Sequence, residues 1–319
     1  MNLARVEQIA KAILYEGYML YPYRPSSVKN RQRWNFGVVY PHGHNDRLEG
    51  ADTCTMQSEC LIRGDQNSVL QARLRFLHLR ARLQHPPSSP AFSLPDGWQE
   101  AIEREVAIPD RTLEALGQRT FRLTFNFPPA HTEEHRQAAL QGTIEIFAVR
   151  LREDLFKIAI TVRNNTPVDG ASPNRDEALM RSLVSAHLVL GAERAAFVSL
   201  LDLPEDLRQF AGSCQNQGWW PVLVGDPGQC DTLLASPIIL YDYPQIAPES
   251  VGDLFDGTEI DEILSLRILT LTDDEKREIR QSDERARQIL ERTESMPEEQ
   301  FMKLHGAVRG LRPVKESRP

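Results

Sequence analysis

Alternating apolar and polar positions dominate residues 55–244 and predict β-strands. The segments TFRLTFNF (120–127), GTIEIFAVRL (142–151) and FKIAITVRNNTP (156–167) place apolar or β-branched residues at every second position, which is the period of a strand with one buried face. REDL (152–155), between the last two segments, predicts the turn of an antiparallel hairpin. The same alternation in VLQARLRFLHLRARL (69–83) favours a long strand over a helix.

Further strands and two helices follow from the remaining patterns. We predict strands at RSLVSAHLVLGAERAAFVSLLD (181–202), WWPVLVG (219–225) and SPIILYDYP (236–244), and a short helix at LPEDLRQFAGSC (203–214). Apolar residues at three- and four-residue steps from Leu3 to Leu14 predict an amphipathic N-terminal helix. About eight strands with local connections indicate a large antiparallel sheet or a sandwich.

The C-terminal part of the chain changes to helical patterns beyond Gly252. LTDDEKREIRQSDERARQILERTES (271–295) predicts one helix with a narrow apolar stripe, which opens with a capping box of Thr272 and Glu275. We therefore predict a β-rich α+β protein. Its main domain, with the N-terminal helix, covers residues 1–250, and a helical C-terminal appendage with a basic tail covers residues 251–319.

Composition and charge limit the function classes. The net charge of −8 argues against nucleic acid as the main partner, because phosphate binding requires a positive surface. No run of about 18 apolar residues occurs, so we expect no membrane insertion and predict a cytoplasmic protein. Four cysteines in 319 residues are too few for a disulfide scaffold, and we expect free thiols.

The segment HTEEH (131–135) is the sharpest chemical motif. It matches the H-x-x-E-H pattern, in which two histidines on one helix bind zinc and the glutamate acts as base. It predicts a metal-dependent hydrolase that uses His131, Glu134 and His135. The neighbouring FNFPPA and RQAALQG favour a solvated loop or one short helix instead, and this alternative stays open.

Two other segments offer metal ligands. Cys214 and Cys230 flank QNQGWWPVLVGDPGQ and would approach one another across a strand and a turn, which suggests a metal or redox role; the alternative is two isolated thiols. PHGHND (41–46) offers His42, His44 and Asp46, and the two histidines would face the same side of an extended chain, as two metal ligands must; the alternative is a polar turn.

Two charged patches stand out. YPYRPSSVKNRQRWNFG (21–37) combines basic and aromatic residues without an acid, a composition typical of phosphate, carboxylate or protein-interface recognition. The stretch after SPIILYDYP carries carboxylates without a basic residue. The two patches either pair with each other or serve as docking surfaces. The residues concerned are Arg24, Lys29, Arg31, Arg33 and Trp34 in the basic patch, and Asp253, Asp256, Glu259 and Asp261 in the acidic patch.

Several of these segments together carry a family resemblance. YPYRPSSVKNRQRWNFG, MQSECLIRG, AAFVSLLD, WWPVLVG and SPIILYDYPQIAPESVGDLFDGTEIDEILSLRILTLTDDEK resemble a bacterial protein family associated with nickel–iron (NiFe) hydrogenase gene clusters. The resemblance covers nearly the whole chain. It implies an accessory, assembly or maturation role for an uptake hydrogenase, and it identifies no catalytic residue.

The resulting hypothesis is an accessory protein that binds a hydrogenase subunit or a maturation factor and needs no cofactor. Catalysis is the less favoured hypothesis. The alternatives are a metal-dependent hydrolase at His131, Glu134 and His135, or a carrier of zinc, nickel or iron that uses Cys214 and Cys230.

Overall fold

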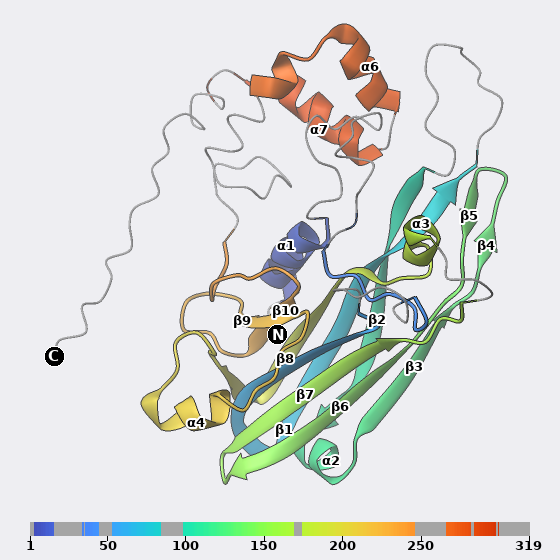
Figure 1. The fold of residues 1–319 in the computed structure, drawn as a ribbon. Coiled ribbons are helices and arrows are strands. Elements are labelled where there is room, and N and C mark those ends of the chain that lie inside the picture. The colour runs from blue at the N-terminus through green and yellow to red at the C-terminus, as the bar shows by residue number, and fades with distance from the viewer. Residues whose placement is uncertain are drawn as a thin grey trace. The chain divides into compact units, whose positions relative to one another are not determined.

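The computed structural model describes residues 3–15, 34, 36–44, 53–83, 98–168, 174–245, 266–281, 284–297 and 299. The chain divides into two compact units (Figure 1). One comprises Met1–Leu20 with Pro25–Gln245, and the other comprises Tyr21–Arg24 with Ile246–Pro319. None of the described helices is long and apolar enough to cross a membrane.

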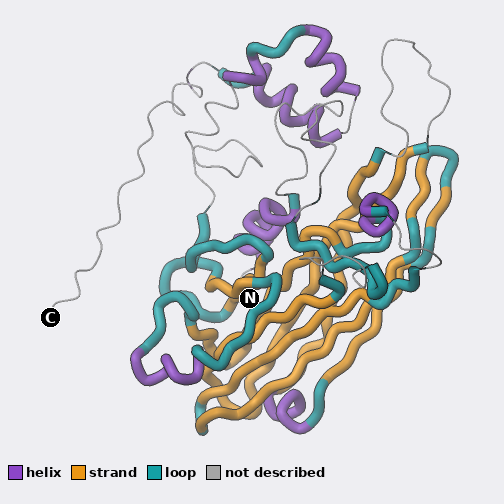
Figure 2. The backbone as a smooth tube through the Cα atoms, in the orientation of Figure 1, coloured by secondary structure: helices purple, strands orange, loops and turns teal. Residues whose placement is uncertain are grey.

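The first unit is built on one antiparallel sheet, which confirms the predicted β-rich α+β fold (Figure 2). Ten strands of the described part join it, along a main path of β3-β6-β7-β1-β8-β10-β9. The sheet is open at its edges. The strands are β1 (Thr55–Arg82), β2 (Gln99–Thr112), β3 (Phe121–Phe127), β4 (Ala130–His131), β5 (His135–Gln137), β6 (Leu140–Arg152), β7 (Leu155–Asn164), β8 (Val184–Val198), β9 (Trp220–Leu223) and β10 (Thr232–Ser236).

The predicted hairpin at REDL is confirmed. β6 and β7 pair antiparallel, with Arg152 opposite Leu155 at the closing turn. Apolar residues of both strands at alternate positions are fully buried, as the period of two requires.

Strand β1 extends over 28 residues and organises the sheet. Its first half pairs with β7 and its second half pairs with β2, while β8 pairs with parts of both halves. The pairing with β8 is interrupted between Gly64 and Val69, where β1 bends (Figure 1). Beyond the bend, the second half of β1 faces β3, and Phe76 contacts the rings of Phe125 and Phe127 in that strand.

The main apolar core fills the space between the two halves of this folded sheet. It contains the inward-facing residues of β1, among them Ile62 and Leu74, together with those of β6, β7, β8 and β10. The six-residue helix α2 (Leu113–Gln118) adds Leu113 and Leu116 to the same core, and its N-terminus is capped by the hydroxyl of Thr112.

The outer face of the sheet is covered in part by the predicted N-terminal helix, which is confirmed as α1 (Leu3–Leu14). Val6 and Ala10 of α1 pack against Val189, Val222 and Leu234 of three different strands. Among its described residues, this unit also has the short helices α3 (Arg175–Leu179) and α4 (Arg208–Ala211), and between them the 3-10 helix η3 (Glu205–Leu207), which directly precedes α4. The last two lie where the sequence predicts a short helix.

Within residues 271–295, the described part of the C-terminal unit has two helices where the sequence predicts one. These are α6 (Asp273–Gln281) and α7 (Glu284–Glu294), and Nη2 of Arg280 lies 2.6 Å from Oε2 of Glu294. Fourteen residues of one straight helix span about 21 Å, so the two helices must fold back on each other. The predicted capping box is formed, with the Thr272 N–H donating to Glu275 Oε2 and the Glu275 N–H donating to Thr272 Oγ1.

The strand predicted at SPIILYDYP is wrong in its position. β10 ends at Ser236, and residues 237–245 form no strand. The alternation that suggested a strand is nevertheless real, because Ile238 and Leu240 pack inward while Ile239 and Tyr241 are exposed. Pro237 and Pro244 lack the N–H groups that a further ladder would need.

Candidate functional site

The HTEEH segment forms a β-hairpin, and the helix on which the metalloprotease pattern depends is not formed. β4 and β5 pair with His131 opposite Arg136, and the turn is closed by the Thr132 N–H donating to the His135 carbonyl at 2.9 Å. His135 Nε2 instead lies 2.9 Å from Oε2 of Glu100. His131 and His135 therefore lie on different strands, and the helical arrangement proposed for His131, Glu134 and His135 is corrected to a strand pair.

The thiols of Cys214 and Cys230 have separate surroundings. Cys214 packs with the small apolar cluster around Leu61 and Leu207, whereas Cys230 packs on the main core, with its sulfur 3.8 Å from the hydroxyl of Tyr243. All four cysteines are free. Within the described residues, no three or more His, Cys, Asp or Glu side chains are grouped to hold a metal ion.

The PHGHND segment is a turn in which the two histidines have different exposure. His42 is exposed, whereas His44 is buried and stacks on the ring of Tyr40 at 4.9 Å. The two rings therefore do not present a common face, and Asp46 lies outside the described residues.

Most of the two charged patches lies outside the described residues, namely Arg24, Lys29, Arg31, Arg33, Asp253, Asp256, Glu259 and Asp261. Trp34 is described and is only 4% exposed. Its indole N–H donates to Oε1 of Gln99 at 2.9 Å. Trp34 therefore contributes to the interior and not to a surface patch.

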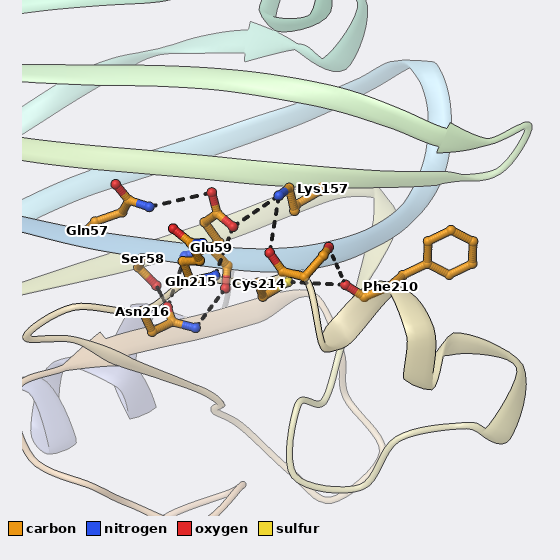
Figure 3. A network of polar contacts seen from close by, with 9 residues as sticks. Gln57, Ser58, Glu59, Lys157, Phe210, Cys214, Gln215 and Asn216 are labelled. Atoms are coloured by element: carbon orange, nitrogen blue, oxygen red, sulfur yellow. Dashed lines mark hydrogen bonds and ion pairs between the residues drawn. The ribbon is translucent and has the colours of Figure 1, made fainter.

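A buried ion pair lies at the centre of a polar network that joins β1, β7 and the loop after α4 (Figure 3). Glu59 of β1 and Lys157 of β7 approach to 3.1 Å, and their side chains are 8% and 18% exposed. The same carboxylate oxygen of Glu59 accepts the backbone N–H of Gln215 at 2.9 Å. The ammonium of Lys157 also donates to the carbonyl of Ser213 at 3.4 Å. The pair thus links two strands to the loop that follows α4.

Asn216 continues this network along the open edge of β1. Its Oδ1 accepts the Glu59 N–H at 2.9 Å and the Ser58 hydroxyl at 3.0 Å, and its amide donates back to the Glu59 carbonyl at 3.2 Å (Figure 3). Gln57 and Gln217 then exchange two backbone hydrogen bonds. The side chain of Asn216 thus replaces a missing strand and satisfies the backbone of β1.

Burial suppresses the reactivity of the nearby thiols. It raises the pKa of Cys214 to about 11, with a further increase from Glu59 and an opposing effect of Lys157. Burial, Cys214 and Glu59 raise the pKa of Cys60 still more. Thiolates are the nucleophilic and metal-binding form of cysteine, so this environment is typical of structural thiols.

The network determines where the next residues lie. Gly218 has a φ of 76°, and a Cβ atom there would meet Cγ of Met56 at 2.9 Å, so glycine allows the chain to turn closely over β1. Trp219 is then fully buried, with its indole N–H donating to the Ala186 carbonyl at 2.7 Å. Trp220 begins β9 and is 40% exposed.

Exposed apolar side chains lie on β9, the last strand on the main path of the sheet, and on segments that hydrogen bonds connect to it. Trp220 lies opposite Ser236, and Leu223 accepts the N–H of Tyr243, so residues 237–243 pass from one edge of β9 to the other. Ile239 and Tyr241 in this segment are 72% and 88% exposed. We define Leu201, Trp220, Ile239 and Tyr241 as the apolar edge surface.

Asp242 holds this surface in place. Its Oδ1 accepts the Leu223 N–H at 2.8 Å, and its Oδ2 accepts the hydroxyl of Ser199. Ser199 Oγ in turn accepts the N–H of Leu201 at 3.0 Å. One carboxylate therefore joins the exposed Leu201 and Tyr241 to the edge strand.

The polar network and the apolar edge surface are the two features that sequence reasoning missed. The contact between Glu59 and Asn216 spans 157 residues, and no local pattern reveals it. The surface did leave a signal, because the outward positions of the IILYDY alternation are apolar where an exposed edge is normally polar. Comparison with known family models and with curated proteins finds no match for this chain.

Proposed function

We propose that the protein is a cytoplasmic accessory protein that acts by binding another protein through the apolar edge surface. Its partner in this proposal is a subunit or a maturation factor of a NiFe uptake hydrogenase. The observation that carries the binding role is the exposure of Trp220 on the edge strand β9, and of Ile239 and Tyr241 on the segment that Asp242 anchors to β9. The hydrogenase partner rests on the family resemblance of the sequence.

The residue types of this surface support binding. Tryptophan and tyrosine are enriched among the interface residues that contribute most to affinity, because they bury a large apolar area while losing little conformational entropy. Burying a side chain such as that of Ile239 contributes roughly 1.5–3 kcal/mol.

The polar network supports a structural role for Glu59 and Lys157. The carboxylate is already engaged by an ammonium, a backbone N–H and the amide of Gln57. A general base has to reach a proton of the substrate, whereas these contacts bind the carboxylate within the protein. The network therefore serves to order the loop that leads into Trp220.

Affinity purification from the native host tests this proposal. Tagged wild-type protein is expected to retain a hydrogenase subunit or a maturation factor, and the double variant Ile239→Ser/Tyr241→Ser is expected to lose it. Val149→Ser is a matched control, because Val149 is 40% exposed on β6. Unchanged melting temperatures of both variants would show that the fold is intact.

The outcomes separate the two parts of the proposal. Equal recovery of the partner with the double variant would refute the apolar edge surface as the docking site. Recovery of other proteins in place of hydrogenase components would refute the partner and leave the surface supported. A separate variant that reverses Asp253, Asp256 and Glu259 to lysine tests the predicted acidic docking stretch, for which unchanged binding would count against docking.

A further inference from the structure

The inner face of β1 changes from apolar to cationic toward the C-terminal end of the strand. Leu74 and Phe76 belong to the core, and the next positions on the same face are His78, Arg80 and Arg82. Neighbouring strands bring further polar side chains here. Arg104 of β2 lies opposite Phe76, Glu100 of β2 opposite Arg80, and His135 of β5 opposite Arg82.

One carboxylate serves several cations in this cluster. Glu100 is 12% exposed and accepts from Nη2 of Arg80 at 2.8 Å and lies 2.9 Å from Nε2 of His135, while Nη1 of Arg82 is 3.6 Å from its other oxygen. In the part of the chain that the structure describes, no second carboxylate lies within ion-pair distance of Arg80, Arg82 or Arg104. The guanidinium groups of Arg80 and Arg82 thus share one negative charge, and among the described residues Arg104 has no carboxylate partner of its own.

Arg104 is the least neutralised of the three. Its Nη2 donates to the neutral Oε1 of Gln137 at 3.1 Å, and its guanidinium lies 4.9 Å from the ring centre of Phe127. Its Nε is buried and has no hydrogen-bond acceptor among the described residues. A buried guanidinium donor without an anion is unfavourable, because the group has lost water without gaining a partner.

The surrounding side chains fix Arg104 without supplying negative charge. Gln137 is buried, and its amide donates to the carbonyl of His78 at 3.4 Å. Burial and the charge of Arg104 lower the pKa of His78 to about 4, against an opposing effect of the Ala138 carbonyl, so His78 is neutral near pH 7. The excess charge near Glu100 is therefore positive, although the chain as a whole carries −8.

We propose that Arg80, Arg82 and Arg104 form a binding site for an anionic oxygen group, a carboxylate or a phosphate of a small molecule. The planar fork of a guanidinium matches both groups with two parallel hydrogen bonds. An anion here would supply the missing acceptor of Arg104 and balance the excess charge. This site is independent of the apolar edge surface and of the partner proposed above.

Calorimetric titration of the full chain tests the site with two probes, inorganic phosphate and succinate, against chloride at equal ionic strength. At least one probe is expected to bind with a dissociation constant below about 10 mM. Arg104→Gln is expected to weaken that binding about tenfold, and Glu100→Gln to strengthen it, because the competing internal carboxylate is removed. Arg122→Gln is the control, since Arg122 is 68% exposed and pairs with Glu145.

The outcomes distinguish a phosphate ligand from a carboxylate ligand and can overturn the proposal. Binding of phosphate alone would identify a phosphate ligand, and binding of succinate alone a carboxylate ligand. Binding of neither probe, or equal loss in Arg104→Gln and Arg122→Gln, would refute the site. If Arg104→Gln fails to fold, Arg80→Gln replaces it with the same prediction, because the Arg80 side chain is 35% exposed.

Discussion

Replacing Glu59 by glutamine should destabilise the sheet unit through the loss of one buried ion pair. The substitution keeps the shape of the side chain and leaves an oxygen for the Gln215 N–H, while Lys157 loses its carboxylate at 3.1 Å. Removing one partner of a fully buried pair costs roughly 3–5 kcal/mol. Lys157 is 18% exposed and keeps the Ser213 carbonyl at 3.4 Å, so we expect about 2–3 kcal/mol.

A double-mutant cycle isolates the pair from other effects of the substitution. Lys157→Met alone should also destabilise, because it leaves the carboxylate of Glu59 buried without its cation. The double variant Glu59→Gln/Lys157→Met should be more stable than the sum of the single effects predicts, by about 1–2 kcal/mol. Arg122→Gln serves as the exposed control, with an expected cost of about 0.5 kcal/mol or less.

Urea unfolding followed by tryptophan fluorescence measures these differences, since Trp219 is buried close to the loop. Hydrogen exchange adds a local readout at the amides of Gln57, Gln215 and Gln217, which donate within the network. These amides should exchange faster in Glu59→Gln than in the control. A loss of less than about 0.5 kcal/mol for Glu59→Gln, or strictly additive single effects, would refute the argument that this pair stabilises the loop.

Three further predictions follow from individual groups. Burial, and to a smaller extent Arg75, lowers the pKa of His187 to about 4 from its ordinary 6.5. The folded state therefore binds fewer protons than the unfolded state, so the contribution of His187 to stability is complete above pH 6.5 and falls by on the order of 3 kcal/mol as the pH drops toward 4. Urea midpoints of His187→Leu should accordingly show a weaker pH dependence than those of the wild type. The pKa of Cys214 is raised from 9.0 to about 11, so iodoacetamide should alkylate this thiol at pH 8 about 100-fold more slowly than an unperturbed thiol, with a rate that increases up to about pH 11. Rapid labelling of Cys214 at pH 8, located by mass spectrometry, would contradict this. Thr272→Ala removes the hydroxyl that accepts the Glu275 N–H and donates to the Glu275 carboxylate, while the backbone N–H of residue 272 is kept. The loss should destabilise α6 by about 1 kcal/mol, measured as faster hydrogen exchange in α6 than in the sheet.

The sequence predicted those parts of the fold that depend on local patterns. Period-two alternation located β3, β6 and β7, and REDL located their hairpin turn, because side-chain direction and turn chemistry are set by neighbouring residues. The capping box at Thr272 was likewise predictable. The break between α6 and α7 was not, since the helical pattern continues across it and the fold-back depends on contacts such as Arg280 with Glu294.

The candidate sites depended on tertiary contacts and were less predictable. HTEEH carries the spacing of a helical zinc motif, yet pairing of β5 with the end of β1 places it in a hairpin. Strand β1 continues beyond Gly64 because β8 accompanies both halves, which no local signal reveals. The arginines of the cationic cluster are unremarkable in sequence and become a group only through the register of β1, β2 and β5.

Residues 215–220 run from the polar network to Trp220 of the apolar edge surface, and this connects stability with the proposed binding role. Asn216 and Gln217 are fixed to β1, Gly218 turns over Met56, and Trp219 is buried, so Trp220 has little freedom where it enters β9. A surface ordered before binding loses less entropy when the partner docks. Glu59→Gln should therefore weaken partner binding although Glu59 itself is buried, and an unchanged affinity together with faster exchange at Gln217 would restrict the network to a role in stability.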